Sequence, residues 1–503
     1  MKKHRLHIAV LLLSVFPLFL LINCTKTIYV ESDPVNNLRQ NITEILNDPG
    51  FQDSNFGIYI ESLRTGEVIY SQNHHRLFMP ASNMKIFTTA TALVKLGPEF
   101  QYENNILVRG VIDKNGTLTG DLMIKGSGDP TISYRFQDEE GNIRAFKTWI
   151  SDLKKSGIRE IRGNIIGDDN CFDENELGSG WEVDDLQGSY AAPIGGLSFN
   201  ENNIQVIAQP ASTAEEPLVI LTEPVKEFLN IRNNTTTLNT SERSAISINR
   251  LIGTNDVQIR GNAPVNGRNI RRTISIHNPT MYLLSAFKEN LAENGISLTG
   301  ELIDIDEITV YDGFYDDWRV ISTDMSPKLS EIIKPLNKNS NNFMAEQLFR
   351  TTGYHLSGLG SAGNGAIAVK GILSDIGVIN ENIKIYDGSG LSRHSLVTPF
   401  QITSILKYMR NHRSYDVFYN SLPVAGVDGT ISSRMKNTSA ENVVHAKTGT
   451  IEFVRALSGY VKSLENEEFI VSILINHYTE PSSVSSQIQD RLYILLANFK
   501  RNR

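Results

Sequence analysis

The feature that most constrains the fold is the placement of strand patterns at both ends of this 503-residue chain. Near the start, FGIYIESLRTGEVIYSQN (56–73) alternates apolar and polar residues on both sides of Thr65-Gly66, which predicts a β-hairpin. Near the end, the stretch from HAKTGT to SGYVKS (445–463) and EFIVSILIN (468–476) predict two strands. Helical patterns lie between these regions. We therefore expect the two ends to share one antiparallel sheet, with the middle of the chain looped out.

Between about 100 and 320 the sequence pattern changes from helical to mostly β-type. Short β-type runs such as NILVRGVI (105–112) and DVQIRG (256–261) are separated by Gly, Asn and Pro, and TMYLLSAFKENLAENG (280–295) is the one clear helix there. Helical periodicity returns after about 321. This pattern predicts an α+β fold with a mostly β insert of two modules.

Residues 1–24 predict an export signal. Basic residues precede an apolar run from Ile8 to Ile22, whose 15 residues are too few to cross a membrane comfortably as a helix. The run ends in LINC, where Cys24 is a candidate for lipid attachment, although Asn23 departs from the small residue expected before it. We predict an exported, periplasmic protein anchored as a lipoprotein through Cys24. An ordinary cleaved signal and an uncleaved anchor stay open as alternatives.

Charge and cysteine content exclude other classes. The net charge is −8, and the body of the chain has no cluster of Lys and Arg, so we expect no nucleic-acid partner. Cys24 and Cys171 are too few for a disulfide framework, and neither has a partner at zinc-ligand spacing. The pair Asp168-Asp169 near Cys171 follows the strand-like NIIG and predicts a turn. We therefore predict no metal site and no cofactor.

A candidate nucleophile lies in PASNMKIF (80–87), where Ser82 precedes Lys85 at the start of a predicted helix. One helical turn separates them, so both side chains share a face. Lys85 lies between two apolar residues, and a lysine in an apolar setting has a lowered pKa, which lets it act as the base for a serine. The backbone N–H of Ser82 would be free to stabilise an oxyanion. The structural alternative is that Lys85 pairs with a buried acid.

The Ser-x-x-Lys spacing alone is weak evidence, because it recurs at Ser151/Lys154, Ser285/Lys288, Ser404/Lys407 and Ser433/Lys436. Two later motifs strengthen it. Ser340-Asn341-Asn342 opens a predicted helix and offers a second hydroxyl and an amide, and Lys447-Thr448-Gly449-Thr450 lies on a predicted strand and offers a cation and hydroxyls. The three motifs occur in the order nucleophile, relay and strand, each in the element that its role requires.

With these motifs the sequence resembles the serine penicillin-binding proteins and β-lactamases, and within them the low-molecular-mass, class C D-alanyl-D-alanine carboxypeptidases/endopeptidases with a large insert. Further stretches fit that subgroup, namely GSGDPT (126–131), GWEVDDLQGSYAAP (180–193), DGSGLSRHSLVTP (387–399) and LPVAGVDGT (422–430). The resemblance covers about 40 to 500. Between Ser82 and Ser340 the chain is far longer than a simple β-lactamase requires, and the β-rich insert fills this gap.

The resemblance implies a penicillin-binding-type domain, an antiparallel sheet with helices on both sides, formed by 38–100 and 320–503. The insert would comprise domain II (101–125 and 200–319) and domain III (126–199). It further implies a serine DD-peptidase without cofactor that acts on peptidoglycan stem peptides and is inhibited by β-lactams.

The resemblance also implies a role for each motif residue. Ser82 would attack the D-Ala-D-Ala carbonyl, Lys85 would take its proton, and Ser340 would pass a proton to the leaving D-alanine. Asn342 would hold the substrate amide and Lys447 would supply positive potential. The strand motif, with Thr448, Gly449 and Thr450, would bind the terminal carboxylate, and the oxyanion would lie between the N–H groups of Ser82 and Thr450.

A second group of residues would recognise the side chain of the wall peptide. Matching motif to motif points to Asp185 and Tyr190 in the insert and Arg393 in the DGSGLSR loop, with Asp184 as an alternative acid. Glu452, just past the strand motif, stands where related proteins can carry a neutral amide, so the side-chain preference stays open. Carboxypeptidase and endopeptidase activity need the same residues. The rival functions are a β-lactamase or esterase on this scaffold and a non-catalytic wall-binding protein.

Overall fold

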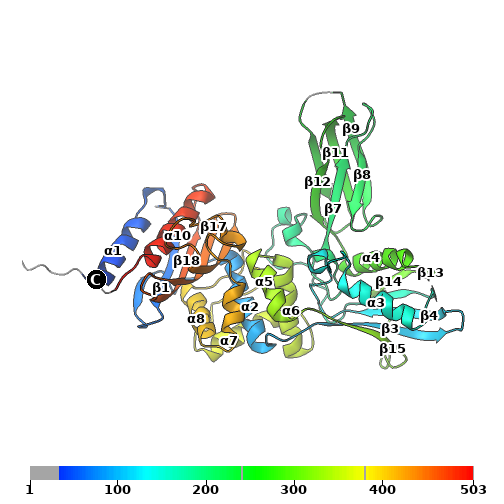
Figure 1. Cartoon of the computed structure of the whole chain (residues 1–503), viewed down its shortest axis with the longest axis horizontal. Coiled ribbons are helices and arrows are strands. Elements are labelled where there is room, and N and C mark those ends of the chain that lie inside the picture. Colours follow the sequence, from blue (N-terminus) through cyan, green and yellow to red (C-terminus); the bar gives the residue numbers. More distant parts are fainter. Residues whose placement is uncertain (1–32, 52, 240–241, 379–380, 502–503) are drawn as a thin grey trace, which may run out of the picture.

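The computed structural model describes residues 33–501, apart from 52, 240–241 and 379–380 (Figure 1). The predicted signal segment, including Cys24, lies outside the described residues. Within the described part of the chain, no helix combines the length and the apolar character needed to cross a lipid bilayer.

The two ends of the chain build one five-stranded sheet, as the sequence predicts. The strand order is β16-β17-β18-β1-β2, and β1 pairs antiparallel with β18, with Ile58 opposite Ile473. Because helices cover both faces, β1 and β18 are buried along nearly their whole length, which explains their long apolar runs. The strands are β1 (Asn55–Ser62), β2 (Val68–Gln72), β16 (Val444–Ile451), β17 (Val454–Lys462) and β18 (Glu468–Asn476).

The C-terminal region contributes three strands to this sheet, where the sequence pattern predicts two. The difference arises at Glu452-Phe453, which forms the turn between β16 and β17. Phe453 has a φ of 60°, a left-handed conformation that usually selects glycine or asparagine. The turn therefore carries no Gly or Pro signal, and the two strands read as one segment.

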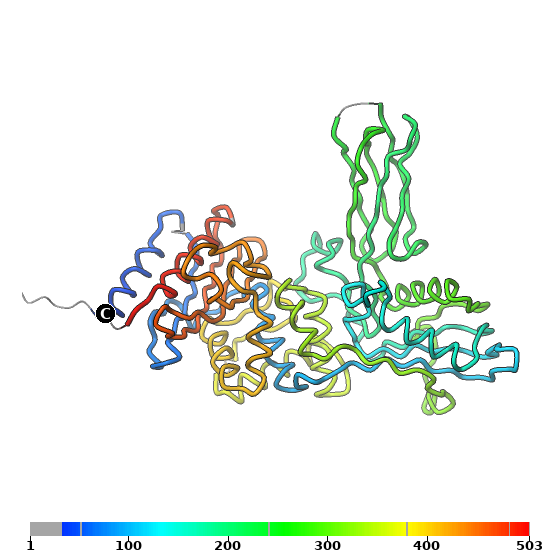
Figure 2. The backbone as a smooth tube through the Cα atoms, viewed as in Figure 1, coloured from blue at the N-terminus to red at the C-terminus, as the bar shows by residue number. Residues whose placement is uncertain are grey.

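Helices form a layer on each face of the sheet (Figure 1). On one face α1 (Pro34–Leu46) packs against α10 (Ser482–Ala497), so the two ends of the described chain lie side by side (Figure 2). On the other face α2 is the central helix and contacts the five others. These helices are α2 (Met84–Lys95), α5 (Leu329–Lys338), α6 (Asn342–Ser357), α7 (Ala362–Asp375), α8 (Pro399–Arg410) and α9 (Tyr415–Ser421).

The insert leaves the domain of the five-stranded sheet after α2 and returns before α5. Its first part is a seven-stranded sheet with α3 (Arg144–Lys155) and α4 (Pro279–Glu293) packed on it around the buried Trp149. The strands of this sheet are β3 (Glu103–Ile112), β4 (Thr117–Lys125), β5 (Glu160–Arg162), β6 (Ile165–Asp168), β13 (Ser297–Leu298), β14 (Leu302–Asp304) and β15 (Arg319–Met325).

The second part of the insert is an arm that rises above the seven-stranded sheet in Figure 1. It consists of two three-stranded sheets, ordered β12-β7-β8 and β10-β11-β9. Their strands are β7 (Asn203–Gln209), β8 (Val219–Glu223), β9 (Asn230–Leu238), β10 (Ala245–Arg250), β11 (Asp256–Pro264) and β12 (Ile270–Ser275).

Strand pairing divides the insert differently from the prediction. The predicted domain III (126–199) includes β5 and β6, yet both pair in parallel with β4, which was assigned to domain II. Helix α3 provides the crossover that parallel pairing requires. The predicted domain II also joins 101–125 to 200–319, although 203–275 forms the separate arm. Short apolar runs reveal a strand but not its partner, so the sequence pattern does not show which strands share a sheet.

Candidate active site

Ser82 lies in a single 3-10 turn, Ala81–Asn83, that leads directly into α2. Two glycines allow other segments to approach this turn closely. A Cβ on Gly390 would lie 1.8 Å from the carbonyl oxygen of Ala81, and one on Gly449 would lie 2.7 Å from that of Pro80. Asn83 Nδ2 also donates to the carbonyl of Lys447 at 2.8 Å. The start of α2 is therefore fixed between the 387–395 loop and β16.

Lys85 is fully buried one turn further along α2, and its amine has three partners. Its Nζ lies 2.9 Å from Ser82 Oγ, 2.7 Å from Asn342 Oδ1 and 2.8 Å from the carbonyl oxygen of Ser389. Burial lowers the pKa of Lys85 to about 7, and the negative charges of Asp387 and Glu346 oppose this shift. A substantial fraction of Lys85 is therefore neutral near pH 7.

A neutral amine has two N–H donors and one lone pair. Asn342 Oδ1 and the Ser389 carbonyl can only accept, so they take the two hydrogens of Lys85. The lone pair is then directed at the third partner, the hydroxyl of Ser82. The site thus holds Lys85 in the orientation in which it can remove the Ser82 proton.

The second and third motifs meet opposite this pair. Ser340 has a φ of 56° and precedes Asn341, which caps α6 by accepting from the N–H of Met344. Lys447 Nζ donates to Ser340 Oγ at 2.8 Å and to the carbonyl of Thr448 at 3.0 Å. Burial lowers the pKa of Lys447 well below its usual value, and the nearby Lys85 lowers it further. The five predicted catalytic residues are thus brought together.

The catalytic groups open onto a cleft with two parts. The larger part, about 670 Å³, extends from Ser82, Ser340 and Asn342 towards the insert. The smaller part, about 290 Å³, runs along the strand motif towards α10. In this smaller part Thr448 Oγ1 lies 2.8 Å from Thr430 Oγ1, and Arg455 donates to Thr450 Oγ1. Hydroxyls and a guanidinium next to the nucleophile are suited to bind a carboxylate.

The predicted side-chain subsite lines the larger part of the cleft, where both Asp184 and Asp185 are found with Tyr190 and Arg393. Tyr190 donates its hydroxyl to Asp185 at 2.7 Å. Burial and this hydrogen bond raise the pKa of Tyr190 to about 12. The backbone carbonyl of Tyr190 accepts from Asn342 Nδ2 at 2.9 Å, which links the insert to the catalytic residues.

Arg393 has acidic partners that the sequence prediction did not identify. Its Nε forms a 2.8 Å ion pair with Glu182, and one Nη lies 3.7 Å from the carboxylate of Glu452. A further hydrogen bond of 3.1 Å joins Arg393 to the backbone carbonyl of Glu452. The charge of Arg393 is therefore partly balanced by the protein itself. Glu182 lies within GWEVDD and Thr430 ends LPVAGVDGT, so both could have been proposed from these stretches, whereas Arg455 had no local signal.

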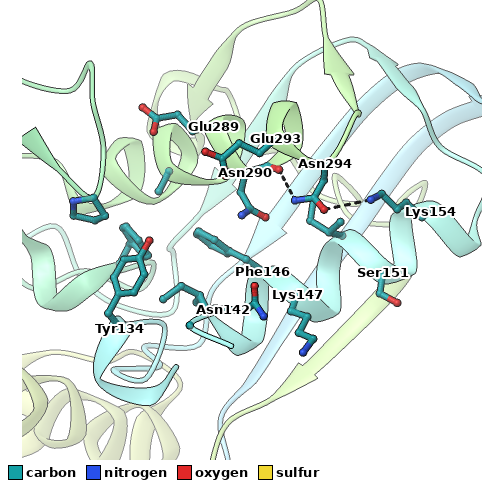
Figure 3. Close-up of a pocket in the computed structure, with 16 residues that line it drawn as sticks. Tyr134, Asn142, Phe146, Lys147, Ser151, Lys154, Glu289, Asn290, Glu293 and Asn294 are labelled. Atoms are coloured by element: carbon teal, nitrogen blue, oxygen red, sulfur yellow. Dashed lines mark hydrogen bonds between the residues drawn. The ribbon is translucent and has the colours of Figure 1, made fainter. Parts of the chain in front are cut away.

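One of the other Ser-x-x-Lys pairs, Ser151 and Lys154, also borders a pocket (Figure 3). This pocket of about 500 Å³ lies between α3 and α4 in the insert. Lys154 is exposed, and its Nζ donates to Asn294 Oδ1 at 3.3 Å instead of contacting Ser151. Because Lys154 is exposed and does not contact Ser151, this pair lacks the buried setting and the mutual contact that a nucleophile and its base need.

Known proteins resemble this chain along most of its length. A sequence model of the D-Ala-D-Ala carboxypeptidase 3 (S13) family matches residues 38–499. The D-alanyl-D-alanine carboxypeptidase of Actinomadura sp. (strain R39) is 31% identical over 479 residues, covering 92% of this chain and 85% of that protein. The crystal structure of penicillin-binding protein 4 (dacB) from Haemophilus influenzae has a TM-score of 0.77 and 25% identity, covering 92% of this chain and 99% of that one.

A second crystal structure of the Haemophilus influenzae protein, complexed with a β-lactam, has a TM-score of 0.73 and 24% identity, with the same coverage of both chains. Both structures share the α+β penicillin-binding fold with its extra insert. Because the family model spans nearly all of the described residues, the chain belongs to the D-Ala-D-Ala carboxypeptidase 3 (S13) family.

Proposed function

We propose that this protein is a serine DD-peptidase in which Ser82 is the nucleophile and Lys85 is its general base. The observation that carries the proposal is the environment of the Lys85 amine. Two acceptors take its hydrogens at 2.7 and 2.8 Å, and the remaining position faces Ser82 Oγ at 2.9 Å. Burial lowers the pKa of Lys85 to about 7, so the neutral form needed for proton removal is accessible.

Catalysis would proceed in two steps. Ser82 Oγ attacks the carbonyl carbon of the D-Ala-D-Ala peptide bond while Lys85 accepts the hydroxyl proton. The C–N bond then breaks, and the departing D-alanine amine receives a proton through Ser340 Oγ, which lies 2.8 Å from Lys447 Nζ. The resulting ester on Ser82 is hydrolysed by water, which regenerates the hydroxyl. The backbone N–H groups of Ser82 and Thr450 would stabilise the oxyanion in both steps.

The terminal carboxylate of the substrate would bind in the smaller part of the cleft. Thr448 and Thr450 offer hydroxyls there, the buried amine of Lys447 lies beside the carbonyl of Thr448, and Arg455 lines both parts of the cleft. β-Lactams carry a carboxylate beside a reactive amide in the same relation, so they would acylate Ser82. The relative of known structure that was crystallised with a β-lactam supports this expectation.

The test is intact-mass analysis of the protein lacking residues 1–24 after incubation with benzylpenicillin. The wild-type protein should gain the mass of one penicillin, because the acyl-enzyme ester keeps both parts of the opened lactam. The Ser82→Ala variant should gain none. A folded wild-type protein that neither gains mass nor consumes penicillin would contradict the proposed function.

We propose which side chain of the wall peptide the enzyme prefers from the residues that line the larger part of the cleft. Asp185 would bind an ammonium group of the wall-peptide side chain, Tyr190 would pack against it, and Arg393 would bind its carboxylate. The same groups serve cleavage of D-Ala-D-Ala and of a D-alanine cross-link. Endopeptidase activity is therefore proposed beside carboxypeptidase activity.

Replacing Arg393 by Gln is expected to lower kcat/KM about 3- to 10-fold for a peptide whose side chain ends in an amino acid group. The loss is modest because Glu182 and Glu452 already balance part of the Arg393 charge. A peptide with an amine but no side-chain carboxylate should be cleaved by the variant as by the wild type. Equal losses for both peptides would argue against a carboxylate site at Arg393.

The cellular location is proposed from the sequence. The apolar run and LINC support cleavage before Cys24 and lipid attachment to its sulfur, which would hold a periplasmic enzyme at the membrane. The mass of the N-terminal peptide from the native protein checks this proposal. An unmodified Cys24, or a chain that begins at another residue, would contradict it.

A further inference from the structure

We propose that Glu346 is a positioning residue for Lys85, acting through the backbone of Gly388 and Ser389; the inference rests on the proposed function of Ser82 and Lys85. Glu346 is 2% exposed and lies on α6, one turn after Asn342, so both residues point from the same face of the helix. Asn342 contacts the Lys85 amine directly, whereas Glu346 reaches it through the 387–395 loop.

The Glu346 carboxylate is bonded to the two residues that bring the loop to Lys85. Gly388 N–H donates to Oε1 at 3.0 Å and to Oε2 at 3.1 Å, and Ser389 N–H donates to Oε1 at 2.7 Å. The carbonyl of the same Ser389 accepts from Lys85 Nζ at 2.8 Å. Glu346 therefore holds the N–H of the residue whose carbonyl oxygen takes one of the two Lys85 hydrogens, and that carbonyl belongs to the adjacent peptide group, between Ser389 and Gly390.

The loop has little freedom to move away from this arrangement. A Cβ on Gly388 would lie 2.4 Å from the side chain of Phe349 and 2.8 Å from the carbonyl of Ala345, so the loop backbone rests directly on α6. Thr88 Oγ1 donates to the Gly388 carbonyl at 2.6 Å from the side of α2. Loss of the Glu346 acceptors would leave the buried N–H groups of Gly388 and Ser389 without partners, and a small loop shift that satisfies them would turn the Lys85 lone pair away from Ser82.

The charge of Glu346 also affects the protonation of Lys85. Lys85 is faced by Glu346 from α6, by Asp387 from the loop and by Lys447 from β16. Glu346 in turn is faced by Asp387 and by Arg350, one turn further along α6. Burial, with Asp387, raises the pKa of Glu346 to about 7, while its N–H donors oppose the shift. The ionised carboxylate, which its two N–H donors favour, stabilises protonated Lys85, so removing that charge makes Lys85 easier to deprotonate.

The experiment measures the rate of benzylpenicillin acylation against pH by intact mass, for the wild type and for Glu346→Gln. The glutamine keeps the volume but turns an N–H group towards the loop donors. We expect the maximal rate to fall at least about tenfold and the acid limb of the profile to move to lower pH. An unchanged maximal rate, or an acid limb that does not move to lower pH, would overturn the inference.

Two further variants keep the result interpretable. Glu346→Asp retains the charge but is one methylene shorter, so its acylation rate should fall while the acid limb of its pH profile stays near that of the wild type. If Glu346→Asp were acylated at the wild-type rate, the inference would be overturned even if Glu346→Gln failed to fold. Glu467→Gln removes another fully buried carboxylate, bonded to Ser62 and Arg501. It should lower the melting temperature and leave the pH profile unchanged. A wild type that is never acylated would overturn the proposed function itself.

Discussion

Replacement of Lys85 by Met lowers the rate of Ser82 acylation by benzylpenicillin about 1,000-fold or more, equivalent to about 4 kcal/mol in the barrier. Methionine fills nearly the same volume in the buried site but has no lone pair that can take the Ser82 proton. The variant also loses the donors to Asn342 and Ser389, so both the base and its support disappear. The time course of adduct formation, followed by intact mass, gives the rate.

The matched control is Lys407→Met. Lys407 belongs to another Ser-x-x-Lys pair, with Ser404 in α8, but it is half-exposed and forms an ion pair with Glu61. Its replacement should leave the acylation rate unchanged. If Lys85→Met were acylated within tenfold of the wild-type rate, Lys85 would not be the base, and the structural role of a buried charge would be the better interpretation.

The second large effect that we expect is the dependence of the acylation rate on pH. Only neutral Lys85 can accept the Ser82 proton, and its pKa of about 7 means that each pH unit below this value reduces the neutral fraction about tenfold. We therefore expect the acylation rate at pH 5 to be about 100-fold below its plateau, which is reached above about pH 8.

Acylation rates measured from pH 5 to pH 10 test this expectation, with circular dichroism at each pH to show that the protein remains folded. A lysine with its ordinary pKa would instead give a rate that keeps rising towards pH 10. A profile of that kind would show that the environment of Lys85 does not favour its neutral form, and it would contradict the proposed mechanism.

The shared sheet could be predicted from the sequence because its signals are local. Apolar alternation marks β1 and β2 beside Thr65-Gly66, and the long apolar run marks β18. The core of the site could be predicted for a related reason. Ser82 and Lys85 are one helical turn apart, and the other two motifs lie at a helix start and on a strand, so each motif is recognisable within a few residues.

Features that depend on distant partners could not be predicted. The parallel pairing of β4 with β6, which places Leu122 opposite Ile165, leaves no mark in either strand. The contact of Arg393 with Glu182 joins two loops that are far apart in the chain. Glu346 is an intermediate case, because its four-residue spacing from Asn342 was visible, but the backbone groups that it holds were not.

The order of the strands has a consequence for biosynthesis. Ser82 and Lys85 emerge early, whereas β16, β17 and β18 are made last, and β18 must insert between β17 and the much earlier β1. Contacts between segments so distant in sequence form slowly. A chain whose synthesis has stopped before β16 therefore contains its nucleophile but lacks Lys447 and the completed sheet. The site would be complete only after the last three strands have been made.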